Sequence, residues 1–258
     1  MRIVVNADDF GLSADTVRAT IDAVNAGHVT SATLMPNAPA SAEAIEFARS
    51  ASGVSFGVHL TFVGDGDERP VSSSQGVPVL VDRAGKLRRT NVVRLAAVLG
   101  RLPVDQLARE IEAQVEWARS RGVEVSHVDS HRHLHKYGPF REALARALPR
   151  LGISRVRNVQ DVYLRRPLLS PTVWLGARWR SDLMLRFTTT DHFYMPATAG
   201  DVSWTDLLRA PGLQKSTIEI GVHPGELEEW RMREARGVAE FAQTADSAGC
   251  SLVTWRDI

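Results

Sequence analysis

Strand and helix signals alternate along nearly the whole chain, and this order restricts the fold more than any other feature of the sequence. Short apolar runs, many of them β-branched, indicate strands near residues 3–6, 29–35, 54–60, 123–125, 154–157, 216–222 and 252–254. Strands that are separated by helices favour a parallel sheet with crossover helices. About seven such units in one chain fit a closed or nearly closed barrel. We therefore expect an α/β barrel-like fold, with residues 1–258 as a single domain.

Two stretches interrupt the alternation. The segment from Thr61 to Thr90 is rich in Gly, Ser and Asp and contains Pro70 and Pro78, so we expect a long loop or lid there. The segment from Thr188 to Gly200 has no regular period, and we expect a surface loop.

Composition and charge exclude several classes of protein. Hydrophobic residues make up 44% of the chain and charged residues 24%, as in soluble globular proteins. The formal net charge of +1 provides no global field for nucleic acid or anionic membranes. Cys250 is the only cysteine, and no apolar stretch is long enough for a membrane span or a signal-peptide core. We expect a soluble cytoplasmic protein, with a homodimer as an open option.

Histidine is concentrated in one stretch, from Ser126 to His135. Four of the eight histidines lie there, at positions 127, 131, 133 and 135, together with Asp129. Imidazole and carboxylate groups are common ligands of divalent metals. A single stretch seldom completes a metal site, so other segments are expected to contribute.

Three other polar positions also follow predicted strands: Asp8 with Asp9, then His59, then His223. In a parallel barrel the carboxyl ends of all strands lie on one face, where active sites are built. Each position also has a simpler interpretation when it is taken alone. The two aspartates could cap a helix, His59 could be a hydrogen-bonded core residue, and His223 could shape a turn before its proline. All four segments coincide on one face, which favours a site.

The residue types predict a catalytic metal centre. Asp9, His59 and one histidine of the cluster would supply a carboxylate and two imidazoles, which leaves coordination positions open for water and substrate. Asp8 would then be free to accept a proton, and His223 would be the matching acid. This arrangement is typical of the hydrolysis of an acyl or phosphoryl bond. The spacing alone does not decide which histidine of the cluster is the ligand.

Four motifs together resemble the YdjC-like carbohydrate deacetylases, which include diacetylchitobiose deacetylases and a hopanoid-biosynthesis branch. The motifs are Asn6-Ala7-Asp8-Asp9-Phe10-Gly11, Gly57-Val58-His59-Leu60, the segment from His127 to His135, and the segment from Glu219 to Gly225. They occur in the order of the family and span nearly the whole chain. The resemblance implies a distorted (β/α) barrel related to the polysaccharide deacetylase fold.

The resemblance also implies an activity, the removal of an acetyl group from an N-acetylated sugar. It implies Asp9, His59 and His131 as metal ligands and Asp8 as the catalytic base, and it suggests His223 as the general acid. It leaves the divalent metal open between zinc, which the ligand set suits, and magnesium. The segments from Thr61 to Thr90 and from Arg165 to Gly200 do not identify the sugar.

Further residues are candidates for substrate contacts. We expect Arg157 to orient Asp8 or to bind a sugar hydroxyl, with an ordinary surface arginine as the alternative. His127, Asp129, His133 and His135 are each candidates either to support the ligands or to face the substrate, and we name His133 and His135 as substrate contacts. The aromatic candidates for sugar stacking are Trp174, Trp179, Phe193 and Tyr194.

Two other functions stay open. One is a metal-dependent phosphoesterase, because His-x-His pairs such as His131 and His133 also build di-metal sites; a second metal and a cluster of Lys or Arg at the mouth would favour it. The other is a non-catalytic sugar-binding protein that retains the site. The presence of both Asp8 and His223 argues against the latter, since a binding protein needs neither.

Overall fold

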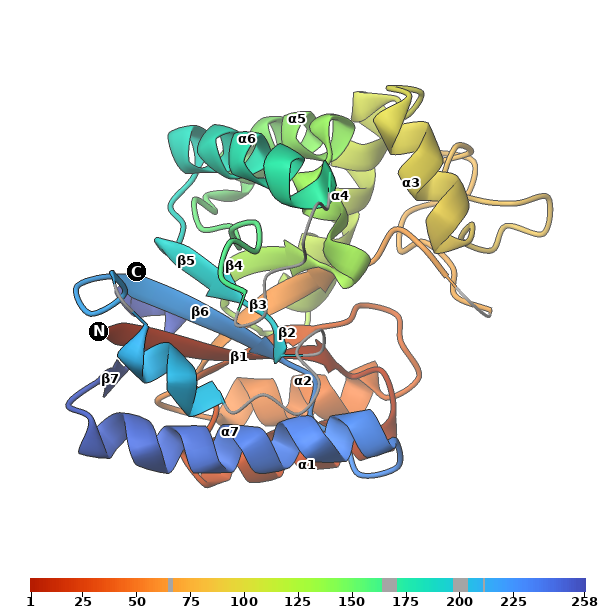
Figure 1. Ribbon diagram of the computed structural model, residues 1–258. Coiled ribbons are helices and arrows are strands. Elements are labelled where there is room, and N and C mark those ends of the chain that lie inside the picture. The colour runs from red at the N-terminus through yellow and green to blue at the C-terminus, as the bar shows by residue number, and fades with distance from the viewer. Residues whose placement is uncertain (65–66, 164–170, 197–203, 211) are drawn as a thin grey trace.

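The computed structural model is an α/β distorted barrel built on a parallel half-barrel sheet (Figure 1). It describes residues 1–64, 67–163, 171–196, 204–210 and 212–258, with only the backbone for 171–174. The strands are β1 (Arg2–Phe10), β2 (Ser31–Leu34), β3 (Ser55–Leu60), β4 (Val125–Ser130), β5 (His192–Tyr194), β6 (Thr217–Val222) and β7 (Ser251–Leu252). Their order is β4-β3-β2-β1-β6-β5, with β7 paired to β1.

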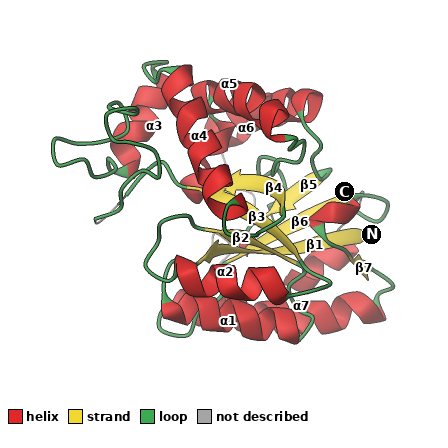
Figure 2. Ribbon diagram, turned by 180° about the vertical axis from the view of Figure 1, so that it is seen from behind, coloured by secondary structure: helices red, strands yellow, loops and turns green. Residues whose placement is uncertain are grey.

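Helices cover both sides of the sheet (Figures 1 and 2). The α-helices are α1 (Ala14–Asn25), α2 (Ser41–Ser50), α3 (Thr90–Val98), α4 (Val104–Arg119), α5 (Gly138–Ala147), α6 (Pro171–Arg186) and α7 (Glu229–Ser247). The 3-10 helices are η1 (His131–Lys136), η2 (Leu148–Leu151), η4 (Trp204–Arg209) and η5 (Trp255–Asp257). Helices α1, α2 and α7 lie along one side, and α3 to α6 lie on the other. This layering buries the apolar runs of the strands.

Strand β1 is the central strand and is longer than the sequence predicts. It runs through Asp8 and Asp9 to Phe10, whereas the apolar run ends at Val5. Its pairing with β2 is irregular between Ala7 and Phe10, and its first residues pair with both β6 and β7. The last strand therefore joins the first, and the two ends of the chain lie near each other (Figure 1).

Two predictions about strands were wrong. The segment from Thr188 to Gly200, expected to be a surface loop, contains β5, which pairs with β6. This strand has only three residues, too few to show a period. Conversely, residues 154–157 form no strand and make only isolated bridges, Val156 to Val128 and Arg155 to Thr188. Val128 belongs to β4 and Thr188 precedes β5, so an irregular segment lies between the two on this side of the barrel.

The long loop that was predicted from Thr61 to Thr90 is confirmed over its described residues. It contains no strand and only one isolated bridge, between Val81 and Leu87. The buried carboxylate of Glu110 on α4 anchors the loop, because it accepts hydrogen bonds from the backbone amides of Val71 and Ser72. The loop leads into α3, which projects at the edge of the molecule beside the carboxyl ends of the strands (Figure 1).

None of the described helices is long and apolar enough to cross a membrane.

Candidate active site

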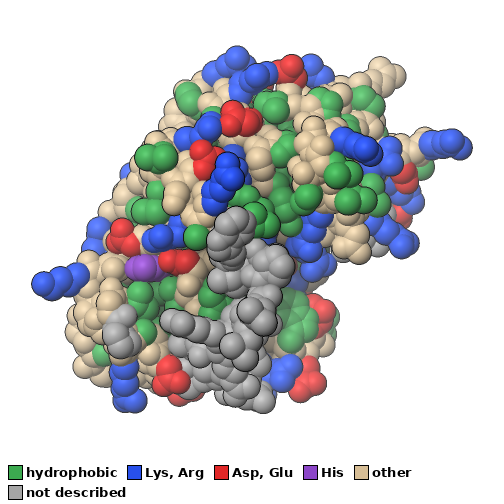
Figure 3. Space-filling view, turned by 45° about the horizontal axis from the view of Figure 1, so that its top comes forward, with side chains coloured by type: hydrophobic (Ala, Val, Ile, Leu, Met, Phe, Trp, Pro, Cys, Tyr) green, Lys and Arg blue, Asp and Glu red, His purple; other side chains and the backbone are tan. Residues whose placement is uncertain are grey.

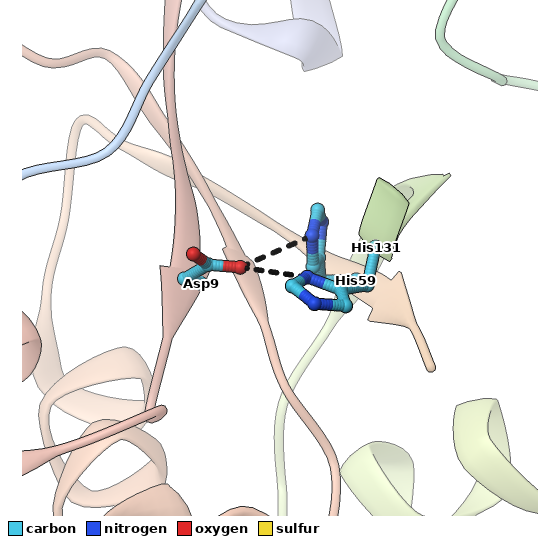
Figure 4. Close-up of side chains that lie close together, drawn as sticks. All are labelled: Asp9, His59 and His131. Carbon is cyan, nitrogen blue, oxygen red and sulfur yellow. Dashed lines mark hydrogen bonds and ion pairs between the residues drawn. The ribbon is translucent and has the colours of Figure 1, made fainter. Parts of the chain in front are cut away.

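Asp9, His59 and His131 meet above the carboxyl ends of β1, β3 and β4 (Figure 4). Asp9 Oδ1 lies 3.1 Å from His131 Nδ1 and 3.4 Å from His59 Nε2. One potential ligand atom from each residue lies within 4.8 Å of the other two. The carboxylate and the two imidazoles that the sequence suggested therefore come together, and the histidine of the cluster that joins them is His131.

Each potential ligand has a buried partner that fixes its orientation. His59 is the cross-strand neighbour of Asp129, and its Nδ1 lies 2.8 Å from Asp129 Oδ1. This contact leaves His59 Nε2 pointing at Asp9, the usual arrangement of a histidine that binds a metal. Arg231 donates a 2.9 Å hydrogen bond to the other oxygen of Asp9, Oδ2. The donor atoms fit one divalent ion, with the carboxylate oriented by an arginine and the imidazole by an aspartate.

The backbone has an unusual conformation at Asp9 and at the two residues that follow His131. Asp9 has a φ of 57°, within the irregular pairing of β1 with β2. Successive residues of a regular strand face opposite sides, so an irregular pairing at this point lets both Asp8 and Asp9 reach the site. Arg132 and His133 have φ values of 59° and 54°. Non-glycine residues adopt this left-handed conformation at a cost of about 1–3 kcal/mol each, and such residues cluster at functional sites.

Arg157 lies beneath Asp8 and binds both of its oxygens. Its Nη1 donates to Asp8 Oδ2 at 2.5 Å and its Nη2 to Asp8 Oδ1 at 2.6 Å. Burial raises the pKa of Asp8, but the charge and the hydrogen bonds of Arg157 outweigh burial and hold that pKa well below its usual value. Asp8 is consequently ionised at neutral pH. Because its pKa is low, Asp8 is a weak base. It could therefore deprotonate only a water molecule whose own pKa is lowered.

The expectation that Arg157 contacts a sugar was wrong. Its side chain is fully buried and also contacts Asp129 and Glu219, at 2.6 Å and 2.8 Å. Three carboxylates converge on one guanidinium because its planar donors can bind several oxygens at once. The alternative role, orienting Asp8, matches this geometry. Burial raises the pKa of Glu219 to about 7, although the charge and hydrogen bond of Arg157 oppose the shift.

His223 approaches Asp8 from β6. Its Nε2 lies 3.9 Å from Asp8 Oδ2, and its Nδ1 lies 3.2 Å from Glu234 Oε2 on α7. Burial lowers the pKa of His223, but the hydrogen bond to Glu234 and the charge of Asp8 outweigh it and raise the pKa above its ordinary value. A histidine with a raised pKa is more fully protonated at neutral pH, as a general acid requires.

A cavity of about 480 Å³ opens over these residues. His133 lines it, as expected of a residue that faces the substrate, whereas His135 does not. The His135 ring is buried, with its Nδ1 2.7 Å from Ser130 Oγ, so the prediction that it contacts substrate was wrong. His127 is also fully buried, and burial holds its pKa well below its usual value. His127 and Asp129 are both fully buried, which leaves them the supporting role of the two that the sequence left open.

Of the aromatic residues that were predicted to stack on a sugar, none whose side chain the structure describes lines the cavity. Phe193 and Tyr194 on β5 have only 1% of their surface exposed, so neither can stack on a sugar. Trp179 packs beside Tyr137, outside the cavity lining. The side chain of Trp174 lies outside the described residues. The cavity instead contains Trp230, whose ring lies 5.4 Å from that of His223.

The contribution of α7 to the site was not predicted from the sequence. Trp230, Arg231 and Glu234 occupy its first turns, and α7 is the helix that follows β6 and His223. In parallel α/β units, the helix that follows a strand begins at the carboxyl end of the sheet, beside the site. Charged residues in that first turn were therefore detectable candidates. They were overlooked because α7 is charged along its whole length.

Comparison with known proteins agrees with this architecture. The family model described as YdjC-like protein matches residues 2–249. This chain belongs to the YdjC-like family. One relative, the carbohydrate deacetylase of Halalkalibacterium halodurans, is 30% identical over 229 residues, which are 89% of this chain and 87% of the relative. A carbohydrate deacetylase of Listeria monocytogenes is 37% identical over 131 residues, 51% of each chain.

Two solved structures are similar in fold. A cellobiose-phosphate cleavage protein from Enterococcus faecalis has a TM-score of 0.80 and 23% identity, with 99% of this chain and 98% of that one covered. The lactam utilization protein of Thermus thermophilus has a TM-score of 0.53 and 14% identity, with 98% and 99% covered. At these identities the similarity shows the fold alone, and it supports the distorted α/β barrel of this YdjC-like chain.

Proposed function

We propose that this protein is a metal-dependent hydrolase that removes the acetyl group from an N-acetylated sugar or short oligosaccharide. The observation that carries the proposal is the convergence of Asp9, His59 and His131 beside the Asp8–His223 pair, in a cavity that is large enough for a sugar. The family supports the same reaction, since relatives are named carbohydrate deacetylases.

Asp9, His59 and His131 would hold one divalent ion, zinc or magnesium. When bound, such an ion polarises a carbonyl group and lowers the pKa of water. The protein would orient two of these ligands through Asp129 and Arg231. Two nitrogens and one oxygen suit zinc, and carboxylate with water suits magnesium, so the donor set accommodates either.

The side chains would then move two protons. Asp8 accepts a proton from the attacking water as the water oxygen bonds to the acetamide carbon. His223, which Glu234 helps to keep protonated, donates its proton to the nitrogen as the carbon–nitrogen bond breaks. The products are acetate and an amino sugar. The 3.9 Å between His223 Nε2 and Asp8 Oδ2 supports the proposal that the two groups act on the same bond.

A phosphoesterase is the second candidate. Arg94 and Arg132 line the cavity, and basic residues at the mouth would suit a phosphate substrate. A second metal ion would have to bind the other group of potential ligands, formed by Asp8, His59 and Asp129. Arg157 already binds both of those aspartates, so a guanidinium takes the place of a second cation.

Acetate release tests the proposal. The metal-loaded protein should release acetate from small N-acetylated sugars, should lose the activity to a chelator, and should regain it with zinc or magnesium. Phosphate release from phosphorylated sugars, without acetate, would establish the phosphoesterase instead.

The Asp8→Asn variant tests the base. It should retain bound metal but lose at least about 100-fold in kcat, as expected when a general base is removed. The His131→Ala variant should instead lose metal, as measured by elemental analysis. Full activity of Asp8→Asn would exclude Asp8 as the base.

A further inference from the structure

His127 lies in the layer beneath the candidate active site, and the proposed reaction gives it no role. Figure 3 shows little histidine on the face that it draws, and the His127 side chain is fully buried. Its ring stacks on the indole of Trp255, with the ring centroids 4.8 Å apart. Both ring nitrogens have polar neighbours, since Nδ1 lies 2.8 Å from Ser126 Oγ and Nε2 lies 3.2 Å from Asn6 Oδ1. The ring is therefore a polar element of the core.

The carboxamide of Asn6 joins this ring to the proposed base. Asn6 is fully buried on β1, two residues before Asp8. Its Nδ2 donates hydrogen bonds to Asp8 Oδ1 at 2.9 Å and to Thr33 Oγ1 at 3.1 Å. The Thr33 hydroxyl in turn donates to Asp129 Oδ2 at 3.2 Å. The hydrogen bonds of Asn6 thus branch toward the proposed base and toward an aspartate that orients a potential metal ligand.

The acceptors around Asn6 decide which way its carboxamide faces. Both oxygens of Asp8 accept hydrogen bonds from Arg157, and the hydroxyl proton of Thr33 is committed to a carboxylate. Both neighbours of Asn6 therefore need its amino group. The opposite orientation would place the carbonyl oxygen of Asn6 against the Asp8 carboxylate and leave buried polar atoms unsatisfied, which is costly. The carbonyl oxygen consequently faces His127.

His127 must then carry a proton on Nε2, because a carbonyl oxygen can only accept a hydrogen bond. Burial holds the pKa of His127 well below its usual value, so the ring carries a single proton at neutral pH. Nδ1 is therefore an acceptor, and its donor is the hydroxyl of Ser126. This hydroxyl also lies 2.8 Å from the backbone oxygen of Phe56, but its one hydrogen serves one acceptor. The hydrogen bonds run in one direction, from the Ser126 hydroxyl through the ring and the carboxamide to Asp8.

We propose that His127 is a positioning residue, which donates its Nε2 proton to Asn6 and so holds the carboxamide that hydrogen-bonds the proposed base. The inference deepens the proposed deacetylase function and rests on it for the effect on turnover, though not for the position of the proton. His127 is not among the described residues that line the cavity, so it acts through Asn6. Without this donor the carboxamide is held less firmly, and Asp8 depends on Arg157 alone.

The ¹⁵N nuclear magnetic resonance spectrum of the histidine rings is the first test, and it needs no substrate. In wild-type protein, the His127 ring should show a protonated Nε2 and an unprotonated Nδ1. The His127→Gln variant assigns these signals, because they disappear from its spectrum. A ring that is protonated only at Nδ1 would overturn the proposal, since Nε2 could then not donate to Asn6.

Two substitutions of similar length are the second test. Gln and Met have a similar reach, but only Gln ends in a hydrogen-bond donor. His127→Gln should keep the kcat of acetate release within about threefold of wild type, whereas His127→Met should lower it at least about tenfold, because the base is misplaced. KM and bound metal should change little in either variant. Equal losses of kcat in the two variants, or no loss in either, would refute the role of the donor.

A double-mutant cycle tests whether His127 acts through Asn6. Asn6→Leu removes the carboxamide and should lower kcat by itself, and adding His127→Met to this variant should lower kcat no further. Losses that multiply would show that the two residues act independently and would overturn the proposal. Wild-type protein that releases no acetate would refute the deacetylase alone. In that case, or if a variant fails to fold, the ring spectrum of the wild-type protein decides whether His127 donates to Asn6.

Discussion

Asp8 accepts hydrogen bonds on both carboxylate oxygens from Arg157, and one of these oxygens also accepts from Asn6 Nδ2 at 2.9 Å. These contacts lock the carboxylate in place and keep it ionised. At the residue scale, the position of the proposed base therefore depends on a buried arginine that never meets the substrate. The shape of the guanidinium contributes as much as its charge, because only a planar fork binds both oxygens.

Replacing Arg157 with lysine separates these two contributions. Arg157→Lys keeps the charge among Asp8, Asp129 and Glu219 but loses the bidentate geometry. We expect the protein to remain folded and to bind metal while kcat falls at least about tenfold, because a misplaced base lowers the rate of the chemical step. Acetate-release kinetics, circular dichroism and metal analysis check this. Unchanged kcat would show that the charge alone suffices.

Buried histidines make stability depend on pH. Burial, aided by the charge of Arg157, lowers the pKa of His135 to about 3 from 6.5. Below pH 6.5 the unfolded chain takes up a proton that the folded protein refuses, so the free energy of unfolding falls as the pH drops from 6.5 toward 3. His135→Asn should make the free energy of unfolding depend less steeply on pH, by about 1 kcal/mol per pH unit between pH 6 and pH 5. Urea unfolding of this variant, with the partly exposed His28→Asn as control, measures the difference.

Close packing of two strands holds the site together at the element scale. Strand β3 carries His59, and β4 carries its partner Asp129. Gly57 lets these strands approach, because a Cβ at that position would lie 2.7 Å from both the backbone oxygen and the ring of His127. The backbone oxygen cannot move without shifting β4. A glycine two residues before His59 is therefore part of what positions that histidine.

The Gly57→Ala variant should disturb this pair of strands. We expect the free energy of unfolding to fall by about 1–3 kcal/mol, the usual cost of overpacking, and metal affinity to fall with it. Gly138→Ala is the matched control, because a Cβ at Gly138 would meet nothing within 4 Å. Thermal unfolding and metal titration of both variants test the prediction. Equal stability of the two would show that β4 accommodates the methyl group.

The whole molecule brings distant segments to one point. The three potential ligands come from β1, β3 and the turn after β4, and α7 contributes Arg231 and Glu234 from the other end of the chain. A bound ion would therefore cross-link segments that separate on unfolding. Ligands that bind only the folded state stabilise it in proportion to the logarithm of their concentration.

Metal should accordingly raise the melting temperature. At a free metal concentration about 100 times the dissociation constant, stabilisation of about 2.7 kcal/mol is expected, which corresponds to several degrees for a chain of this size. The melting temperature of the His131→Ala variant should respond far less. Differential scanning fluorimetry with zinc, magnesium and chelator provides the comparison. A response to metal that is the same in both proteins would place the bound ion elsewhere.

The sequence alone was sufficient for the parallel α/β architecture and for the polar positions at strand ends. Both follow from local patterns, namely apolar runs, helical spacing, and the rule that parallel strands share one carboxyl face. The choice of His131 over its neighbours came from the family resemblance, and the grouping of His131 with Asp9 and His59 agrees with it.

Only the tertiary structure decided what surrounds those positions. Arg157 and His135 were expected at the substrate, yet both lie beneath the site, because burial depends on packing between segments far apart in sequence. The strand β5 is too short to carry a period, and it forms because β6 provides a neighbour for pairing. Arg231 and Glu234 look like ordinary surface charges on a charged helix, and they acquire partners only when α7 packs against the carboxyl end of the sheet.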